Sequence, residues 1–143
     1  MMKKYRVGYT AGVFDMFHIG HLNLLRNSRQ YCDSLIVGVN SDMLVQEYKS
    51  KRPVISENDR LAIVAAIKYV DKALLVDTLD KILAWQRLGF DAIFIGDDWK
   101  DNPRWIKTKV DLATVGVDVI FLPYTKGISS TQEREFVDRR IGE

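Results

Sequence analysis

The chain lacks the sequence features that build disulfides, thiolate metal centres or membrane spans. Its 143 residues include one cysteine, Cys32, which excludes an intramolecular disulfide and a metal cage made of thiolates. No apolar run approaches the roughly 18 residues of a membrane span, and the N-terminal residues pass directly into a strand-like pattern. The formal net charge is only +2, so the chain as a whole shows no sign of a nucleic-acid partner. These features predict a cytoplasmic protein that binds neither a membrane nor a nucleic acid.

What the chain does contain is an alternation of short apolar runs with amphipathic stretches. Such an alternation is typical of a mostly parallel sheet covered by helices. The expected strands are 5–11, 34–39, 72–76, 91–96 and 118–123. The expected helices are about 19–31, 59–70 behind a cap at Ser56, 79–88, 104–115 and a last one after "KGISST". The pattern predicts an α/β fold in which residues 1–143 form a single Rossmann-like domain, with a mostly parallel five-stranded sheet and helices on both faces.

Three details of this pattern make further predictions. Thr78 is the expected cap of the helix that ends before Gly89. The helix over 104–115 is expected to turn Ile106, Val110 and Ala113 towards the core. The stretch "LAIVAAI" (61–67) is apolar on nearly every side, so it is either central in the fold or covered by a partner chain; we favour a subunit contact.

Several polar motifs follow the expected strands. "GVFD" and both histidines follow the first strand, and "NSD" with a basic loop over 47–55 follows the second. "GDDW" (96–99) follows the fourth strand and "YTKGISST" (124–131) the last. Ligands of open α/β sheets bind outside the carboxyl ends of the strands. We therefore expect these loops to converge on one crevice.

The protein has only two histidines, His18 and His21, and Gly20 stands between them. Residues three apart share a helix face, and a helix N-terminus already attracts anions. The pair could thus donate to phosphate oxygens, with Gly20 allowing close approach. Two alternatives remain: one buried and one surface histidine without a shared role, or a metal site completed by carboxylates.

The other motifs each allow a structural interpretation as well. "GISST" (127–131) could cradle an anion, or Ser130 and Glu133 could simply form a capping box. The carboxylates of "GDDW" could bind ribose hydroxyls or help to hold Mg²⁺, or could only end the strand. The basic side chains could neutralise a triphosphate or be solvated charges; they are Lys49, Lys51, Arg52 and Arg60.

Taken together, these motifs resemble a known family. "GVFDMFHIGH" is similar to the H-x-G-H signature of the nucleotidyltransferase superfamily, and "KYVD", "GDDW" and "GISST" narrow the resemblance to the cytidylyltransferases, glycerol-3-phosphate cytidylyltransferases above all. It covers nearly the whole chain, from about Lys4 to the last helix. The resemblance implies transfer of CMP from CTP to a phosphorylated alcohol, with release of pyrophosphate, Mg²⁺ carried mainly by the nucleotide phosphates, and a homodimer.

The resemblance also implies roles for individual residues. His18, His21 and Lys51 are the expected catalytic residues. The expected nucleotide-binding residues are Val13, Phe14, Asp15, His18, Gly20, His21, Asp97, Tyr124, Thr125, Lys126, Gly127, Ile128, Ser129, Ser130 and Thr131. The expected acceptor-binding residues are Lys49, Lys51, Arg60 and Lys68. No side chains are expected to form a dedicated metal site.

Three positions depart from the family pattern. Tyr124 and Lys68 stand where family members often carry arginine, and Val13 stands where a threonine is common. Other chemistry also stays open. The acceptor could be choline-phosphate, ethanolamine-phosphate or a sugar phosphate, the nucleotide could be ATP, or the chain could be a catalytically weak nucleotide-binding module.

Overall fold

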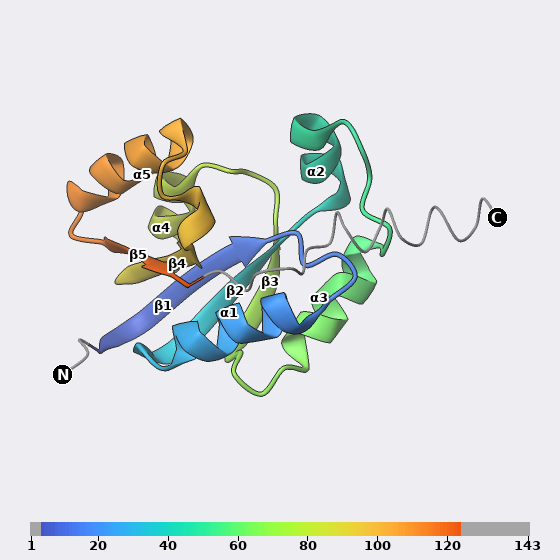
Figure 1. The fold of residues 1–143 in the computed structure, drawn as a ribbon, viewed down its shortest axis with the longest axis horizontal. Coiled ribbons are helices and arrows are strands. Elements are labelled where there is room, and N and C mark those ends of the chain that lie inside the picture. Colours follow the sequence, from blue (N-terminus) through green and yellow to red (C-terminus); the bar gives the residue numbers. More distant parts are fainter. Residues whose placement is uncertain (1–3, 124–143) are drawn as a thin grey trace.

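The computed structural model describes residues 4–123, which contain one five-stranded sheet (Figure 1). Its strands are β1 (Tyr5–Gly12), β2 (Cys32–Asn40), β3 (Lys72–Val76), β4 (Ala92–Gly96) and β5 (Asp118–Leu122). They lie in the order β3-β2-β1-β4-β5, and every neighbouring pair is parallel. The expected α/β fold with a parallel five-stranded sheet is confirmed.

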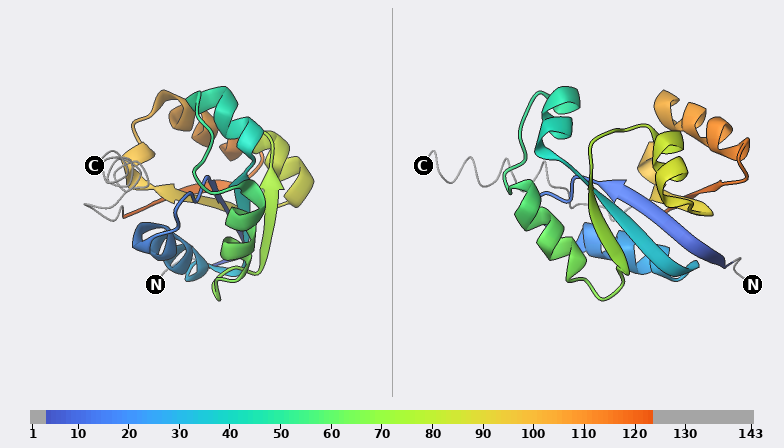
Figure 2. Two further views of the ribbon diagram at one scale, coloured as in Figure 1. Left: turned by 90° about the vertical axis from the view of Figure 1, so that its right-hand side faces the viewer. Right: turned by 180° about the vertical axis from the view of Figure 1, so that it is seen from behind.

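Helices cover both faces of this sheet, also as expected (Figure 2). The helices are α1 (Ile19–Arg29), α2 (Asp42–Lys49), α3 (Glu57–Ala65), α4 (Lys81–Leu88), the 3-10 helix η1 (Asp97–Trp99) and α5 (Pro103–Ala113). Leu25 of α1 and Val64 of α3 belong to a core on one face, whereas Ala84 of α4 and Leu112 of α5 belong to a core on the other. Helix α2 lies past the carboxyl end of β2 (Figure 1).

β1 is the central strand, and its position determines where a ligand can bind. A Cβ added at Gly8 would lie 2.5 Å from the Phe94 ring and 2.8 Å from Cys32 Sγ, so only glycine allows this close packing. In the sheet, β2 and β3 lie on one side of β1, and β4 and β5 lie on the other. The point where strand order reverses, between β1 and β4, is the usual ligand crevice of such sheets.

Several local expectations were wrong. Helix α2 occupies residues for which no helix was expected. Asp80, in place of Thr78, caps α4 by accepting a hydrogen bond from Leu83 N at 3.1 Å. Helix α5 begins at Pro103, behind an Asn102 cap, and it faces the core with a different side from the expected one.

The inward side of α5 carries Trp105 and Leu112, which are 5% and 0% exposed. The residues expected inside are exposed instead: Ile106 at 52%, Val110 at 62%, and Ala113 as well. The reason is that the tryptophan buries far more apolar area than the isoleucine and valine, so it determines which side of the helix faces the core.

Helix α3 tests the prediction made for "LAIVAAI". Val64 is fully buried, but Ile63 is 43% exposed and Ala62, Ala65 and Ala66 are exposed too. The helix is therefore not central in the fold and leaves an apolar face uncovered. No helix within residues 4–123 is both long and apolar enough to cross a membrane.

Candidate functional site

The loop between β1 and α1 is conformationally constrained. Phe14 and Met16 adopt left-handed backbone angles, with φ of +55° and +48°, although neither is glycine. Such conformations persist only where the surrounding structure enforces them, and they cluster at functional sites. Phe14 is buried, and its ring packs against Gly12, where an added Cβ would lie 3.3 Å away.

Asp15 connects this loop to the segment before α3. Its carboxylate accepts hydrogen bonds from the backbone N–H groups of Val54 at 2.8 Å and Ile55 at 2.9 Å. Asp15 is buried, with only 6% of the residue exposed. These charge-assisted hydrogen bonds therefore stabilise the contact strongly. Asp15 thus supports the loop, as the resemblance implies.

The two histidines form the N-terminal cap of α1. His18 Nδ1 accepts a hydrogen bond from Gly20 N at 3.0 Å, and His21 Nδ1 accepts one from His18 N at 3.2 Å. This is the geometry of a capping box with imidazoles in place of the usual side chains. The two rings stack, with centroids 3.9 Å apart and planes at 23°, so both imidazoles stand at one place on the N-terminal turn of the helix.

The capping bonds also determine where each imidazole carries its proton. A ring nitrogen that accepts from a backbone N–H cannot itself be protonated, so each neutral ring is protonated on Nε2. Burial and, to a smaller extent, the electrostatic effect of His18 together lower the pKa of His21 from 6.5 to about 3. His21 is therefore a neutral N–H donor at physiological pH. Its other ring contacts are with Phe14 and Phe17, at centroid distances of 5.4 and 5.3 Å.

Arg60 joins several segments that end at this site. Its guanidinium donates to the carbonyl oxygens of Val13 at 2.7 Å, Asn40 at 2.8 Å and Ile55 at 2.9 Å. It also forms an ion pair with Asp42 at 2.7 Å. The side chain has no exposed surface, so the guanidinium is not accessible to a ligand. The structure thus corrects the expectation of a direct contact with the acceptor: Arg60 holds the loops in place.

A second connection, which the sequence did not reveal, ties α2 to α3. Asp42 N donates to Glu57 Oε1 at 2.9 Å, and Glu57 N donates to Asp42 Oδ2 at 3.3 Å. Each carboxylate thus caps the other helix. The only sequence signal is that an acidic residue occupies the first turn of both helices, which is favourable for the helix dipole.

The basic segment, which begins with the last residue of α2, is exposed at the same edge of the sheet. Lys49, Lys51 and Arg52 are all exposed, and Lys49 Nζ lies 5.8 Å from the centre of the Tyr48 ring. Arg52 donates to Gln46 Oε1 at 3.1 Å. Because Asp15 holds Val54, this segment is anchored beside the β1–α1 loop.

Lys68 is not brought to this site. It is exposed and lies between the end of α3 and the start of β3, so it belongs to the opposite, amino-terminal edge of the sheet (Figure 1). Its ammonium group lies 5.2 Å from the centre of the Tyr69 ring. Because helix α3 runs away from the crevice, the structure does not bring Lys68 to the other site residues of this chain, and its contact with the acceptor stays a prediction.

The acidic motif follows β4 and forms η1 at the crevice. Burial raises the pKa of Asp98, and the charge of Asp97 raises it further. Trp99 is 39% exposed, and the Arg104 guanidinium lies 5.7 Å from the centre of its ring. Within residues 4–123, no group of three or more His, Cys, Asp or Glu side chains could hold a metal ion. A cation carried by substrate phosphates, with one carboxylate of η1 as a protein contact, fits this donor set.

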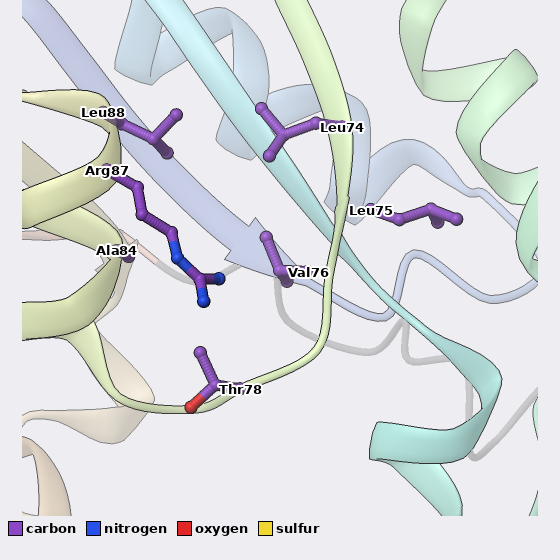
Figure 3. Close-up of a pocket in the computed structure, with 7 residues that line it drawn as sticks. All are labelled: Leu74, Leu75, Val76, Thr78, Ala84, Arg87 and Leu88. Carbon is purple, nitrogen blue, oxygen red and sulfur yellow. The ribbon is translucent and has the colours of Figure 1, made fainter.

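A pocket between β3 and α4 offers little chemistry (Figure 3). Its lining is mostly aliphatic, and it consists of Leu74, Leu75, Val76, Thr78, Ala84, Arg87 and Leu88. Its one charged side chain, Arg87, lies 3.5 Å from Asp77. The predictions for 124–131 lie outside the described residues. The candidate site consists of the histidine cap, Asp15, the basic segment and η1.

Comparison with known proteins identifies the family. The sequence model described as Cytidylyltransferase-like matches residues 9–136. The chain is 34% identical over 141 residues to the FAD synthase of Thermococcus kodakarensis, covering 97% of this chain and 93% of that one. It is 31% identical over 128 residues to the bifunctional protein HldE of Hyphomonas neptunium, covering 88% of this chain but only 26% of that protein. The chain thus spans about a quarter of the length of the HldE proteins that it matches.

A solved structure supports the same conclusion. The lipopolysaccharide core biosynthesis protein from Thermoplasma volcanium superimposes with a TM-score of 0.73 at 28% identity, covering 85% of this chain and 99% of that one. The fold and the family match thus agree with each other. The chain belongs to the cytidylyltransferase-like family.

Proposed function

We propose that this protein transfers a nucleotidyl group from a nucleoside triphosphate to a phosphorylated alcohol and releases pyrophosphate. The observation that carries the proposal is the histidine cap, in which the Nδ1 atoms of His18 and His21 accept backbone hydrogen bonds and each neutral ring is protonated on Nε2. Two N–H donors on one helix N-terminus suit the oxygens of a triphosphate. The sequence motifs favour CTP and glycerol 3-phosphate as the substrates.

The reaction needs no general base. The acceptor phosphate is already largely dianionic near pH 7, because its second pKa is about 6. One of its oxygens attacks the α-phosphorus in line, a new P–O bond forms, and the bond to the β-phosphate bridging oxygen breaks. Catalysis then consists of positioning and of stabilising charge on the phosphate oxygens, which His18 and His21 do as preorganised donors.

The other residues hold the substrates. Lys49 and Lys51 bind the acceptor phosphate and the triphosphate, with Lys51 reaching the reacting groups. Val13, Phe14 and Asp97 line the nucleotide site. Tyr124–Thr131 bind the leaving pyrophosphate. Mg²⁺ accompanies the nucleotide and neutralises its phosphates.

The protein acts as a homodimer in this proposal. The support is the uncovered apolar face of α3, where Ile63 is 43% exposed among exposed alanines. A face of this kind on a short helix is typical of a protein interface.

A second candidate uses ATP in place of CTP. It is favoured by the similarity to FAD synthases, which extends over 93% of the relative from Thermococcus kodakarensis. The product that this name states contains an adenylyl group joined to a flavin phosphate. The crevice would then transfer AMP to a phosphorylated acceptor through the same donors.

One experiment separates these candidates. The purified protein is incubated with Mg²⁺, one nucleotide (CTP or ATP) and one acceptor, and pyrophosphate release is measured. The acceptors are glycerol 3-phosphate, choline-phosphate, ethanolamine-phosphate, a sugar phosphate and FMN. Release that requires both CTP and glycerol 3-phosphate supports the first candidate, and release with ATP supports the second. Nucleotide binding without release in any combination contradicts both and leaves a binding module.

A further inference from the structure

Helix α5 has an apolar stripe on the side that faces away from the sheet. Its inward side carries Trp105 and Leu112, which belong to the core. On the opposite side, Ile106 is 52% exposed and Val110 is 62% exposed, more than any other isoleucine, leucine or valine among residues 4–123. The outward side of a surface helix is ordinarily polar, so a second apolar side on the same helix calls for an explanation.

The exposed apolar residues run along the whole helix. Residues three and four apart share a helix face, which places Pro103, Ile106, Val110 and Ala113 in one row, and all four are exposed. We call this row the outer stripe of α5. Helix α5 contacts β5, an edge strand of the sheet, and the outer stripe therefore lies at the rim of the molecule (Figures 1 and 2).

Basic side chains border the outer stripe on both sides. In a helix with about 3.6 residues per turn, Lys109 lies on one side of the stripe, and Lys107 and Arg104 lie on the other; all three are exposed. The one acidic residue of the helix, Asp111, accepts a hydrogen bond from Lys107 at 2.6 Å. With three basic residues against one acidic residue, α5 carries a net charge of +2, as much as the whole chain.

A row of apolar side chains between two rows of cations matches the surface of an anionic membrane. The apolar side chains of such a helix enter the boundary between lipid headgroups and acyl chains. Lysine and arginine side chains are long enough to keep their charges among the anionic headgroups while their methylene groups cover apolar surface. The outer stripe is a straight row on a convex helix, so a flat and deformable lipid surface can contact all of it at once.

We propose that the outer stripe of α5, together with Lys107 and Lys109, binds an anionic lipid surface. The helix lies in the plane of the interface, and the contact is peripheral and reversible. The proposal revises the expectation of no membrane partner, which was drawn from the total charge of the chain. It does not depend on the reaction proposed above. It also leaves the apolar face of α3 free, because α3 and α5 pack on opposite faces of the sheet.

Vesicle binding tests the proposal directly. The purified full chain is sedimented with vesicles made of equal parts of phosphatidylglycerol and phosphatidylcholine, and with vesicles of phosphatidylcholine alone. The bound fraction is expected to rise with the amount of anionic vesicles and to stay near zero with the neutral ones. Added sodium chloride is expected to release the protein, because salt screens the attraction between exposed charges.

Variants identify the side chains that bind. Ile106→Ser combined with Val110→Ser should lower the partition coefficient about tenfold, because the contact loses the apolar area of both side chains. Lys109→Gln should lower it about fivefold, as the loss of one cation at an anionic surface does. Met43→Ser and Lys72→Gln are the matched controls at other exposed positions, and they should bind like the unmodified chain. Circular dichroism confirms that each variant is folded.

A fluorescent label tests which side of the protein faces the lipid. The single cysteine, Cys32, is fully buried, so a thiol-reactive dye labels only a cysteine introduced at the surface. Ala113→Cys carries the dye at the end of the outer stripe, and Lys72→Cys carries it on β3, the opposite edge strand of the sheet. On anionic vesicles the emission of the dye is expected to shift to the blue at position 113 and to stay unchanged at position 72.

The outcomes are separate from those of the proposed reaction, because none of these measurements uses a nucleotide or an acceptor. Binding that requires anionic lipid, the outer stripe and Lys109 supports the proposal, even if no acceptor reacts. Four results would each overturn it, even if the protein proves active: no binding, equal binding to neutral vesicles, equal losses in the stripe and control variants, or an equal blue shift at positions 72 and 113.

Discussion

The imidazole of His21 accepts a hydrogen bond from the backbone N–H of His18 at 3.2 Å, while the two rings stack with centroids 3.9 Å apart. One nitrogen of each ring therefore builds the helix terminus, and the other carries the proton. The two nitrogens have separate tasks, which means that structural and chemical effects of substitution can be separated.

We expect His18→Asn and His21→Asn to fold but to lose activity. An asparagine amide can replace Nδ1 as the cap acceptor, whereas it lacks a donor at the position of Nε2. Losing one such donor costs about 3 kcal/mol of transition-state stabilisation, or roughly a hundredfold in kcat. The measurement is pyrophosphate release together with urea unfolding. The corresponding glutamine variants place an amide near Nε2 and should retain more activity; near-normal rates in both asparagine variants would contradict the mechanism.

The lowered pKa of His21 predicts a specific pH dependence of stability. In the folded chain the pKa is about 3 and in the unfolded chain it is near 6.5, so between these values only the unfolded chain binds the proton. The free energy of unfolding therefore falls as the pH drops below 6.5, by about 1–2 kcal/mol at pH 5 from this group. Urea unfolding at pH 7 and pH 5 measures the difference. His21→Asn should lose that part of the pH dependence, and an unchanged slope would be the contrary result.

Replacing Arg60 should destabilise the whole site. Arg60→Met leaves the carboxylate of Asp42 and three carbonyl oxygens without their donor, which should lower the free energy of unfolding by about 3–5 kcal/mol. Arg60→Lys keeps the charge but loses the fork geometry, so an intermediate loss is expected. Arg52→Met, an exposed position, is the control and should change stability by less than about 0.5 kcal/mol. Equal stability of the Arg60 and Arg52 variants would disprove the role assigned to Arg60.

Lys81→Met should stabilise the folded chain at pH 7. The folded pKa of about 8 lies below the unfolded value of 10.5, so keeping the ammonium charged in the fold is unfavourable at every pH below 8. Allowing for partial exposure, the gain in the free energy of unfolding is about 1–2 kcal/mol. The difference should disappear as the pH rises from 8 to 10.5, because the folded wild-type chain is then deprotonated. Denaturant unfolding at pH 7 and pH 10 measures it, and a destabilised variant at pH 7 would argue against it.

A single charged substitution on α3 tests the proposed homodimer. Ile63→Glu places a carboxylate on the uncovered face of α3 and should convert the protein from dimer to monomer. Val110→Glu is a matched control, because Val110 is even more exposed, at 62%, but lies on α5. Light scattering after gel filtration gives the mass. A monomeric wild type, or a monomer produced by the Val110 variant alone, would contradict the assignment.

Much of the fold and part of the site followed from the sequence because they depend on simple periodicities. The five apolar runs became five parallel strands, and a parallel sheet necessarily gathers the following loops at one edge. For that reason the histidines, the segment tied to Asp15 and η1 all lie at the carboxyl edge of the sheet, as the order of motifs and strands predicts.

The failures have physical causes as well. Helix α2 was missed because only Leu44 and Val45 of it are buried, and two adjacent apolar residues show no helical period. The wrong side was chosen for α5 because three aliphatic residues in register suggested a buried stripe, although Trp105 buries more area. The role of Arg60 was hidden because three of its partners are backbone carbonyls, which no sequence pattern displays.

The way Arg60 and Asp15 anchor the chain has a consequence for which positions of this protein can change. Asn40 and Val54 are two fixed points of the backbone, because the buried guanidinium of Arg60 holds Asn40 and the buried carboxylate of Asp15 holds Val54. The lysine-bearing stretch between α2 and Pro53 is exposed. Residues between these two fixed points, other than Asp42 and the lysines, can be exchanged without disturbing the histidine cap. In the proposed reaction, such exchanges would alter acceptor preference while the side chains that bind the phosphates stay the same.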